Sequence, residues 1–222
     1  HYPLRRQRQM CIRDSPWHNP ILLAEQASTL DLLSGGRLDF GVGKGYRHNE
    51  FHGFDINMDE AHERYHDCLQ IILKCWNQKK KWNHKSQYWT FNDVIVEPAC
   101  TQKPHPPIWM AAGNSDSIKT VAQQNCNLLL DQFSPVSTVI ERVKIFNNEL
   151  NSYGIKNKPQ IALARAMYIA KDQKEKEEII QKRLKARENV DKLSQRPDGN
   201  NKSSIMVHKG TDEAYNLSLI HI

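Results

Sequence analysis

Between residues 23 and 42 the apolar pattern changes from helical spacing to a short continuous run. The helical part recurs every three or four residues, as on one face of a helix, at Leu23, Ala24, Ala27, Leu30 and Leu33. Gly35 and Gly36 come next, and glycine readily adopts the left-handed backbone that ends a helix. Residues 38–42 are apolar and β-prone. We therefore expect a helix that leads directly into a buried strand, as in parallel sheets covered by helices.

The order of strand and then helix recurs three times further along the chain. The expected strands are Ile108–Ala112, Leu128–Asp131 and Ile161–Ala170. The helices that follow them are expected from about Ile118, over Val136–Tyr153 and over Gln173–Gln195. Four strand-and-helix units without a sign of reversal predict a wound parallel sheet. Periodicity leaves two architectures open, an open doubly wound sheet and a closed (β/α)8 barrel.

The segment between the first and second units contains three further predicted elements. Tyr46–Glu60 is polar with scattered aromatic residues, and we expect a long loop over the end of the first strand. Ala61–Asn77 carries a strong apolar stripe and is expected to form a helix. Tyr88–Phe91 and Val94–Val96 flank Asn92-Asp93, which predicts a hairpin outside the main sheet.

The two ends of the chain are related to each other in a way that folding does not explain. Met10–Ser15 and Leu217–Ile222 can be encoded by one short DNA sequence read on its two strands. Residues 1–15 and 217–222 therefore resemble a translated sequencing adapter, and we expect neither stretch to be native. Residues 16–216 are then expected to be a partial domain, an internal fragment of a longer protein that is inactive by itself.

The charge of the chain is modest once these ends are set aside. The formal net charge is +6, and residues 1–15 contribute four arginines against one aspartate. Half of the excess positive charge therefore comes from the adapter-like segment, which argues against a nucleic-acid partner. No apolar run approaches the roughly 20 residues that span a bilayer, so we expect no membrane residence.

The cysteines outside the adapter-like segment show no metal-binding or redox spacing. They are Cys68, Cys75, Cys100 and Cys126. The absence of a C-x-x-C pair or a dense framework favours buried free thiols and a reducing, cytoplasmic location.

Two of the predicted strand ends carry groups suited to an anionic ligand. Gly43-Lys44-Gly45 lies just beyond the first buried strand, and a cation there suggests a negatively charged ligand. Gly113–Ser117 follows the second strand at the start of a helix, where free amides and the helix dipole favour an anion. From local sequence alone, ordinary helix capping by Asn or Ser is the favoured explanation of that turn.

Two motifs offer other chemistries. His62–His66 reads H-E-x-x-H, a zinc-hydrolase pattern, but Tyr65 lies on the apolar stripe and Leu69 stands where an extended motif needs glycine. Surface or boundary histidines are therefore favoured over a zinc site. The glycines of residues 41–45 are similar to a dinucleotide-binding fingerprint, yet Tyr46 occupies the last glycine position and no helix is expected to open there.

Several sequence blocks occur together in one known family. They are AEQASTLDLLSGGRLDFGVGKGYR, EFHGFDI, KPHPPIWMAAGNSDS and IALARAMYIAKD, in this order. From about Pro20 to Ala214 the chain resembles the bacterial-luciferase-like flavin monooxygenases. The resemblance implies a partial (β/α)8 TIM barrel in which this chain carries about strands 4 to 7 with their helices. Strands 1 to 3 and 8 would be missing, including the strand whose histidine many relatives place near the flavin, so we nominate no catalytic residue.

The resemblance also implies a reaction and its partners. Family members oxidise a small organic substrate with O2 and reduced FMN, which a separate flavin reductase supplies. Some relatives bind the deazaflavin F420 instead and transfer hydride. A homo- or heterodimer is implied for the full-length protein, and pairing within the family also allows a non-catalytic barrel subunit.

The resemblance implies that the two strand ends hold the phosphate of the cofactor. Lys44, beside Gly43, stands where relatives often place an arginine, and lysine keeps the charge but not the bidentate geometry. The second half of the expected clamp consists of Gly113, Asn114, Ser115 and Ser117. Tyr46 and Arg47 are expected to line the mouth of the site. Arg165, expected inside an apolar strand, either pairs with a carboxylate or reaches the cofactor.

Overall fold

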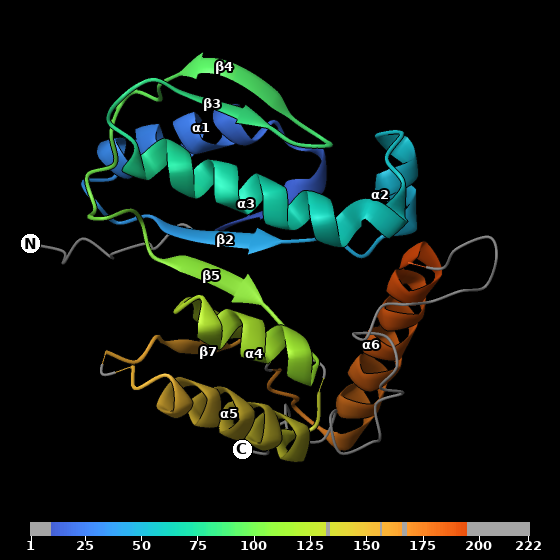
Figure 1. Ribbon diagram of the computed structural model, residues 1–222. Helices are drawn as coiled ribbons and strands as arrows, with labels where there is room; N and C mark the ends of the chain where they lie inside the picture. The colour runs from blue at the N-terminus through green and yellow to red at the C-terminus, as the bar shows by residue number, and fades with distance from the viewer. Residues whose placement is uncertain (1–9, 132–133, 156, 166–167, 195–222) are drawn as a thin grey trace, which may run out of the picture. The chain divides into compact units, whose positions relative to one another are not determined.

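The computed structural model describes residues 10–131, 134–155, 157–165 and 168–194 as an α/β fold (Figure 1). Its residues form two units. Unit 1 holds the residues up to Gly45 together with Phe51–Trp109, and unit 2 holds Tyr46–Glu50 together with the residues from Met110 onward. Residues 195–222, which include the adapter-like segment 217–222, lie outside the described residues.

Unit 1 alternates strands and helices and adds a small hairpin. In chain order its elements are β1 (Met10–Asp14), η1 (Ser15–Trp17), α1 (Pro20–Leu33), β2 (Asp39–Gly43), η2 (Met58–Glu60), α3 (Ala61–Asn77), β3 (Trp82–Lys85) and β4 (Thr90–Val94). Two elements, α2 (His48–Gly53) and β5 (Ile108–Ala111), have residues in both units. β1 and β2 are parallel, and the amide of Phe40 in β2 donates to the carbonyl of Pro107 at 2.8 Å. The expected parallel pairing is therefore present in this unit.

Part of the adapter-like segment takes part in this pairing. Met10 lies opposite Asp39 and Asp14 lies opposite Gly43, so residues 10–14 form a regular parallel strand. A β-ladder is made by backbone amides and carbonyls and accepts most side chains. The strand therefore does not reveal the origin of these residues, and their adapter origin stays a prediction.

The helix α1 begins and ends as its sequence predicts. The Oδ1 atom of Asn19 accepts the amides of Ile21 and Leu22, at 3.0 and 3.3 Å, and Pro20 opens the helix. At the other end, Gly35 and Gly36 have φ values of +65° and +75°. These caps place the start of β2 a short distance beyond the helix.

The helices α1 and α3 lie side by side in unit 1 (Figure 1). Trp76 of α3 connects them, because its indole N–H donates to the carbonyl of Ala24 at 3.0 Å. The same ring meets Phe40 of β2 edge-on, with ring centroids 5.1 Å apart. Phe40 and Val42 are each only 1% exposed, so β2 is buried as expected for a covered parallel strand.

A buried carboxylate joins α1 to the segment that enters β5. Asp31 is fully buried, and its two oxygens accept the amide and the side-chain Nε2 of Gln102 at 2.9 and 2.8 Å. The same Nε2 atom donates to the carbonyl of Leu38 at 2.7 Å. Gln102 thereby fixes the connection before β5 against both the end of α1 and the start of β2.

The hairpin of unit 1 differs from the predicted one. Its strands β3 and β4 are antiparallel, whereas Asn92-Asp93, the predicted turn, lies inside β4. Asp93 has a φ of +53°, and the register shifts between Trp82 and His84 on the opposite strand. A residue in the left-handed region can form a bulge as well as a turn, and here it forms the irregularity.

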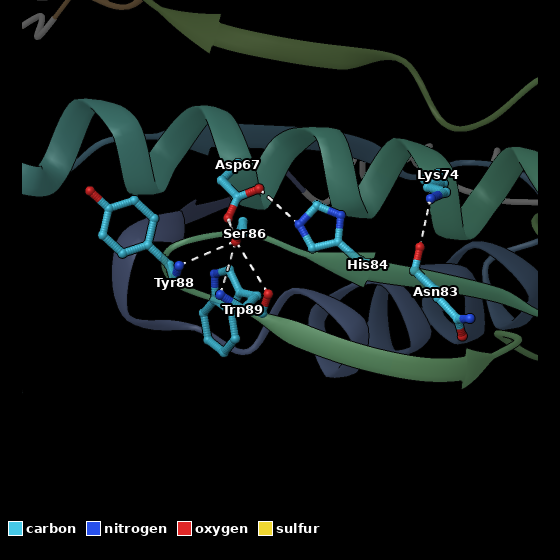
Figure 2. Close-up of polar contacts among 7 residues, drawn as sticks. All are labelled: Asp67, Lys74, Asn83, His84, Ser86, Tyr88 and Trp89. Atoms are coloured by element: carbon cyan, nitrogen blue, oxygen red, sulfur yellow. Dashed lines mark hydrogen bonds and ion pairs between the residues drawn. The ribbon is translucent and has the colours of Figure 1, made fainter.

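The true turn of the hairpin is built by one side chain (Figure 2). Ser86 Oγ accepts the amides of Tyr88 and Trp89 at 3.2 and 3.0 Å. Asp67 of α3 then fastens this turn: its Oδ2 accepts Ser86 Oγ at 2.6 Å, and its Oδ1 lies 3.0 Å from His84 Nε2. The hairpin is thus attached to α3 by a half-buried carboxylate.

Unit 2 contains the remaining strand-and-helix elements. After the end of β5 they are α4 (Ser115–Gln123), β6 (Asn127–Leu130), α5 (Val136–Ser152), β7 (Ile161–Leu163) and α6 (Gln173–Ser194). β6 and β7 are parallel, and the amide of Ala112 donates to the carbonyl of Leu129 at 3.3 Å. Ile118, Phe146 and Leu150 are fully buried. The order predicted from the sequence is confirmed here.

Two predicted boundaries are wrong. The expected loop 46–60 contains α2 and η2, because Phe51 is 1% exposed and packs edge-on against Trp17, with ring centroids 4.9 Å apart. The expected strand Ile161–Ala170 ends at Leu163. Among the described strands β7 pairs only with β6, so it has ladder support on one side.

Replacing Asp31 by alanine is expected to lower the free energy of unfolding by about 1–3 kcal/mol, because the two nitrogens of Gln102 lose a buried acceptor. Urea denaturation followed by far-UV circular dichroism measures this change. The control is Glu25→Ala, an exposed position on the same helix that is expected to change stability by less than about 0.5 kcal/mol. Equal effects of the two substitutions would contradict the role given to Asp31.

Candidate functional site

The turn between β5 and α4 exposes the first groups of a helix. Asn114 has an extended backbone, and its Oδ1 accepts the amide of Ser117 at 2.8 Å. The capping explanation is therefore confirmed at Asn114. The amides of Ser115 and Asp116 precede the first intrahelical hydrogen bond, and the hydroxyls of Ser115 and Ser117 add two neutral donors. Gly113 connects this turn to the strand and is half-buried.

The turn after β6 holds a buried cluster of charged and polar groups. Asp131 directly follows the strand, and its carboxylate accepts the amide and the hydroxyl of Ser134, at 2.7 and 2.8 Å. Arg142 of α5 donates through Nη1 to Asp131 Oδ2 and, at 2.8 Å, to Ser134 Oγ. Arg142 and Ser134 are 5% and 2% exposed. We refer to Asp131, Ser134 and Arg142 as the Asp131 cluster.

Arg165 contacts this cluster. It lies two residues beyond β7, and not inside an apolar strand as the sequence predicts. Its Nη2 donates to the carbonyl of Ser134 at 2.6 Å. Arg165 is half-buried, and its position just after β7 together with its bond to Ser134 puts it beside the carboxyl ends of β6 and β7.

The sequence pattern missed the Asp131 cluster, although one signal was present. The buried residues of α5 are Val139, Arg142, Phe146 and Leu150, which recur at helical spacing. A charged residue on such a stripe needs a partner of opposite charge, because an unpaired buried charge lowers the free energy of unfolding by roughly 3–5 kcal/mol. Arg142 was therefore a candidate for a buried ion pair, and only the structure identifies Asp131 as its partner.

Tyr46 and Arg47 form a local group at the start of α2. The guanidinium of Arg47 lies 5.6 Å from the centre of the Tyr46 ring and 3.2 Å from Glu50 Oε1. A hydrogen bond with Tyr46, followed by the charges of Tyr46 and Glu50, raises the pKa of Arg47. Its Nε is buried and has no hydrogen-bond acceptor in the described part of the chain.

Lys44 lies beyond the end of β2 and is exposed, next to the half-buried Gly43. Gly45 has a φ of +74°, and a Cβ at this position would lie 2.8 Å from the ring of Trp17. Glycine is therefore required at position 45 for local packing, whether or not a ligand binds. Within the described residues, no hydrogen bond or ion pair is recorded for Lys44.

The structure places most of the predicted site residues in one unit. Unit 2 contains Tyr46, Arg47, Gly113, Asn114, Ser115, Ser117 and Arg165, whereas Gly43 and Lys44 belong to unit 1. The two halves of the predicted clamp therefore come from different units. Each half lies beyond the carboxyl end of a strand as predicted, and their action on one ligand stays a prediction.

The H-E-x-x-H motif is engaged in contacts of its own. Glu63 accepts the hydroxyl of Tyr88 at 2.6 Å, and the rings of His62 and His66 are 4.4 Å apart. Among the described residues, no group of three or more potential metal ligands comes together. The lowered pKa of His66 arises first from burial and then from the charge of His62.

Cys68, Cys75, Cys100 and Cys126 are buried thiols that form no disulfide with one another, as predicted. Burial raises the pKa of Cys75 to about 12 and that of Cys126 to about 11. These thiols are therefore protonated near neutral pH and are poor nucleophiles. In the described part of the chain, no helix has both the length and the apolar character needed to cross a membrane.

A family model described as luciferase-like monooxygenase matches residues 10–215. The chain belongs to this family. The resemblance found in the sequence is thereby confirmed. In structure, the chain is similar to the crystal structure of the monooxygenase RslO1 from Streptomyces bottropensis, with a TM-score of 0.68 and 25% identity over 84% of this chain and 55% of that chain. The fold is accordingly part of a (β/α)8 barrel, and the doubly wound alternative is set aside.

Two curated relatives show how much of a luciferase-like protein is present. The chain is 31% identical to the oxygenase component of the flavin-dependent trigonelline monooxygenase of Acinetobacter baylyi, over 70% of this chain and 44% of that protein. It is 24% identical to the FMNH2-dependent dimethylsulfone monooxygenase of Pseudomonas putida, over 76% of this chain and 46% of that protein. The chain therefore spans about half the length of the relatives it matches.

The protonation of His66 is expected to contribute to the pH dependence of the free energy of unfolding. Its pKa is lowered in the folded protein, so below about pH 6.5 the unfolded chain takes up a proton that the folded chain binds less tightly. Stability is therefore lost as the pH falls through this range. His66→Gln, which does not titrate, is expected to flatten the decline in unfolding free energy between about pH 7 and 5. Urea titrations at several pH values measure it, and identical pH slopes for both proteins would rule the effect out.

Proposed function

We propose that this chain is part of a flavin-dependent monooxygenase that uses reduced FMN and O2 to oxidise a small organic substrate. The observation that carries the proposal is membership of the luciferase-like family over residues 10–215. Relatives from two bacterial genera are named as flavin-dependent and FMNH2-dependent monooxygenases. The turns after β5, β6 and β7 lie where barrel enzymes of this architecture carry their ligand-binding residues.

The groups at these turns fit the phosphate of a flavin nucleotide. Amides and hydroxyls at the start of α4 are neutral donors at the positive end of a helix dipole, which suits a dianion. Arg47 adds a buried Nε that has no hydrogen-bond acceptor among the described residues. A phosphate oxygen of a bound ligand would be a suitable acceptor for this donor. Arg165 adds a second guanidinium. Asp116 opposes the fit, because its exposed carboxylate lies in the first turn of the same helix.

Each half of the proposed clamp has a distinct role. Lys44 supplies a point charge, whereas the α4 turn supplies directional hydrogen bonds through Ser115, Ser117 and the first amides. In this proposal each would contribute to holding the phosphate of the cofactor. When bound, reduced FMN supplies the electrons with which O2 is activated. No acid or base is assigned.

The partners follow from this chemistry. A flavin reductase would supply reduced FMN, and the substrate would be a small organic molecule. We place the protein in the cytoplasm as a homo- or heterodimer. F420-dependent hydride transfer and a non-catalytic subunit are the alternatives that the binding experiment separates.

Anaerobic titration tests the cofactor. The protein that contains this chain is titrated with reduced FMN and separately with F420, and absorbance and fluorescence are followed. Saturable binding of FMN and consumption of O2 on mixing with a substrate and a reductase are expected. Binding of F420 without a response to FMN would replace oxygenation by hydride transfer. Binding of neither would support the non-catalytic subunit.

Lys44→Ala is expected to weaken FMN binding by about 1.5–3 kcal/mol, the value of one hydrogen bond to a charged group. Fluorescence titration measures the dissociation constant. The control is Lys79→Ala, which removes the same charge at an exposed position between α3 and β3. If both variants bind FMN like the wild type, Lys44 does not belong to the site.

A further inference from the structure

The Asp131 cluster has more polar contacts than are needed to end a strand. One carboxylate accepts three donors from a turn and a helix, and one guanidinium nitrogen donates both to that carboxylate and to Ser134 Oγ. Arg142 is 5% exposed, although an apolar side chain of similar volume often stabilises such a position as well or better. Stability alone therefore does not explain why a charged residue occupies this position on α5.

The cluster fixes the residue that carries one backbone carbonyl. The amide of Ser134 is held by Asp131 Oδ1 and its hydroxyl by Asp131 and Arg142, while the next residue, Pro135, is tied to the start of α5 through its carbonyl. The carbonyl of Ser134 accepts the Nη2 atom of Arg165 at 2.6 Å. A chain of hydrogen bonds thus runs from α5 through the turn after β6 to a guanidinium beyond β7.

We propose that the Asp131 cluster is a positioning device for Arg165, and that it sets how strongly Arg165 binds the phosphate of the cofactor. This inference rests on the proposed function. Asp131, Ser134 and Arg142 act through Arg165 and do not touch the ligand. The place of Arg165 supports an anionic group as its ligand, because it is a cation just beyond the carboxyl end of β7, the end of the strands where barrel enzymes carry their ligand-binding residues.

The contacts of Arg142 lead us to expect that lysine can replace arginine at this position. Both recorded bonds of its side chain within the cluster come from a single nitrogen, Nη1. A lysine Nζ can donate to the same two oxygens, whereas methionine fills a similar volume and donates to neither. Arg142→Lys should therefore preserve the orientation of Ser134, and Arg142→Met should lose it.

The test compares FMN with riboflavin, which lacks the phosphate. Arg142→Met in the protein that contains this chain is expected to weaken FMN binding by about three- to tenfold and to leave riboflavin binding unchanged. Arg142→Lys is expected to restore most of the FMN affinity. Ser134→Ala, a smaller change, should weaken FMN in the same direction. Lys144→Met, which removes a charge from an exposed position of α5, is the matched control and should change neither affinity.

A double-mutant cycle decides whether Arg142 acts through Arg165. Arg165→Met alone should weaken FMN relative to riboflavin, and Arg142→Met should add little once Arg165 is gone. Additive losses, or equal losses of FMN and riboflavin, would overturn the positioning role while leaving the proposed function intact. If wild-type protein binds neither flavin, the proposed function itself fails. If Arg165→Met leaves FMN binding unchanged in a flavin-binding wild type, only the inference about the Asp131 cluster fails.

Discussion

Parallel strands can pair only after the chain has crossed back to the end where it started, and helices make that crossing in this protein. In unit 2, α4 leads from β5 to β6 and α5 leads from β6 to β7. β5 and β6 therefore each end in a turn that no tight hairpin constrains. Such turns can carry polar groups without breaking a ladder, and Asn114 and Asp131 lie there, with Arg165 just beyond β7. The location of the candidate site is thus a consequence of the way the sheet is connected.

Much of the fold could be predicted because its signals are periodic. The stripe of α3 and the caps of α1 are local features, and the structure has both helices where the sequence places them. The hairpin was predicted but the position of its turn could not be, since that turn depends on a hydroxyl of Ser86 held by Asp67, nineteen positions earlier. Asp93 has the backbone that a turn signal implies, but the opposite strand turns that signal into a bulge.

The candidate site was predictable in kind but not in its detailed contacts. Spacing identified the strand ends and the donors near Ser115, because helix starts have recognisable residues. It could not find the Asp131 cluster, since a sequence does not state which carboxylate meets a buried arginine eleven positions away. Arg165 was given two alternatives, and the structure adds a third partner, a backbone carbonyl. Backbone acceptors have no residue identity and therefore leave no trace in a sequence pattern.

The attachment of the hairpin to α3 has a consequence for how proteins of this kind vary. Residues 82–94 close on themselves through antiparallel pairing and depend on α3 through a few side chains, chiefly Asp67 (Figure 2). We expect the tip of such a segment to tolerate changes in length while the barrel strands keep their register. Differences in length and sequence among relatives should accordingly be concentrated in this hairpin. Asp67 and Ser86, which attach it to α3, should be retained.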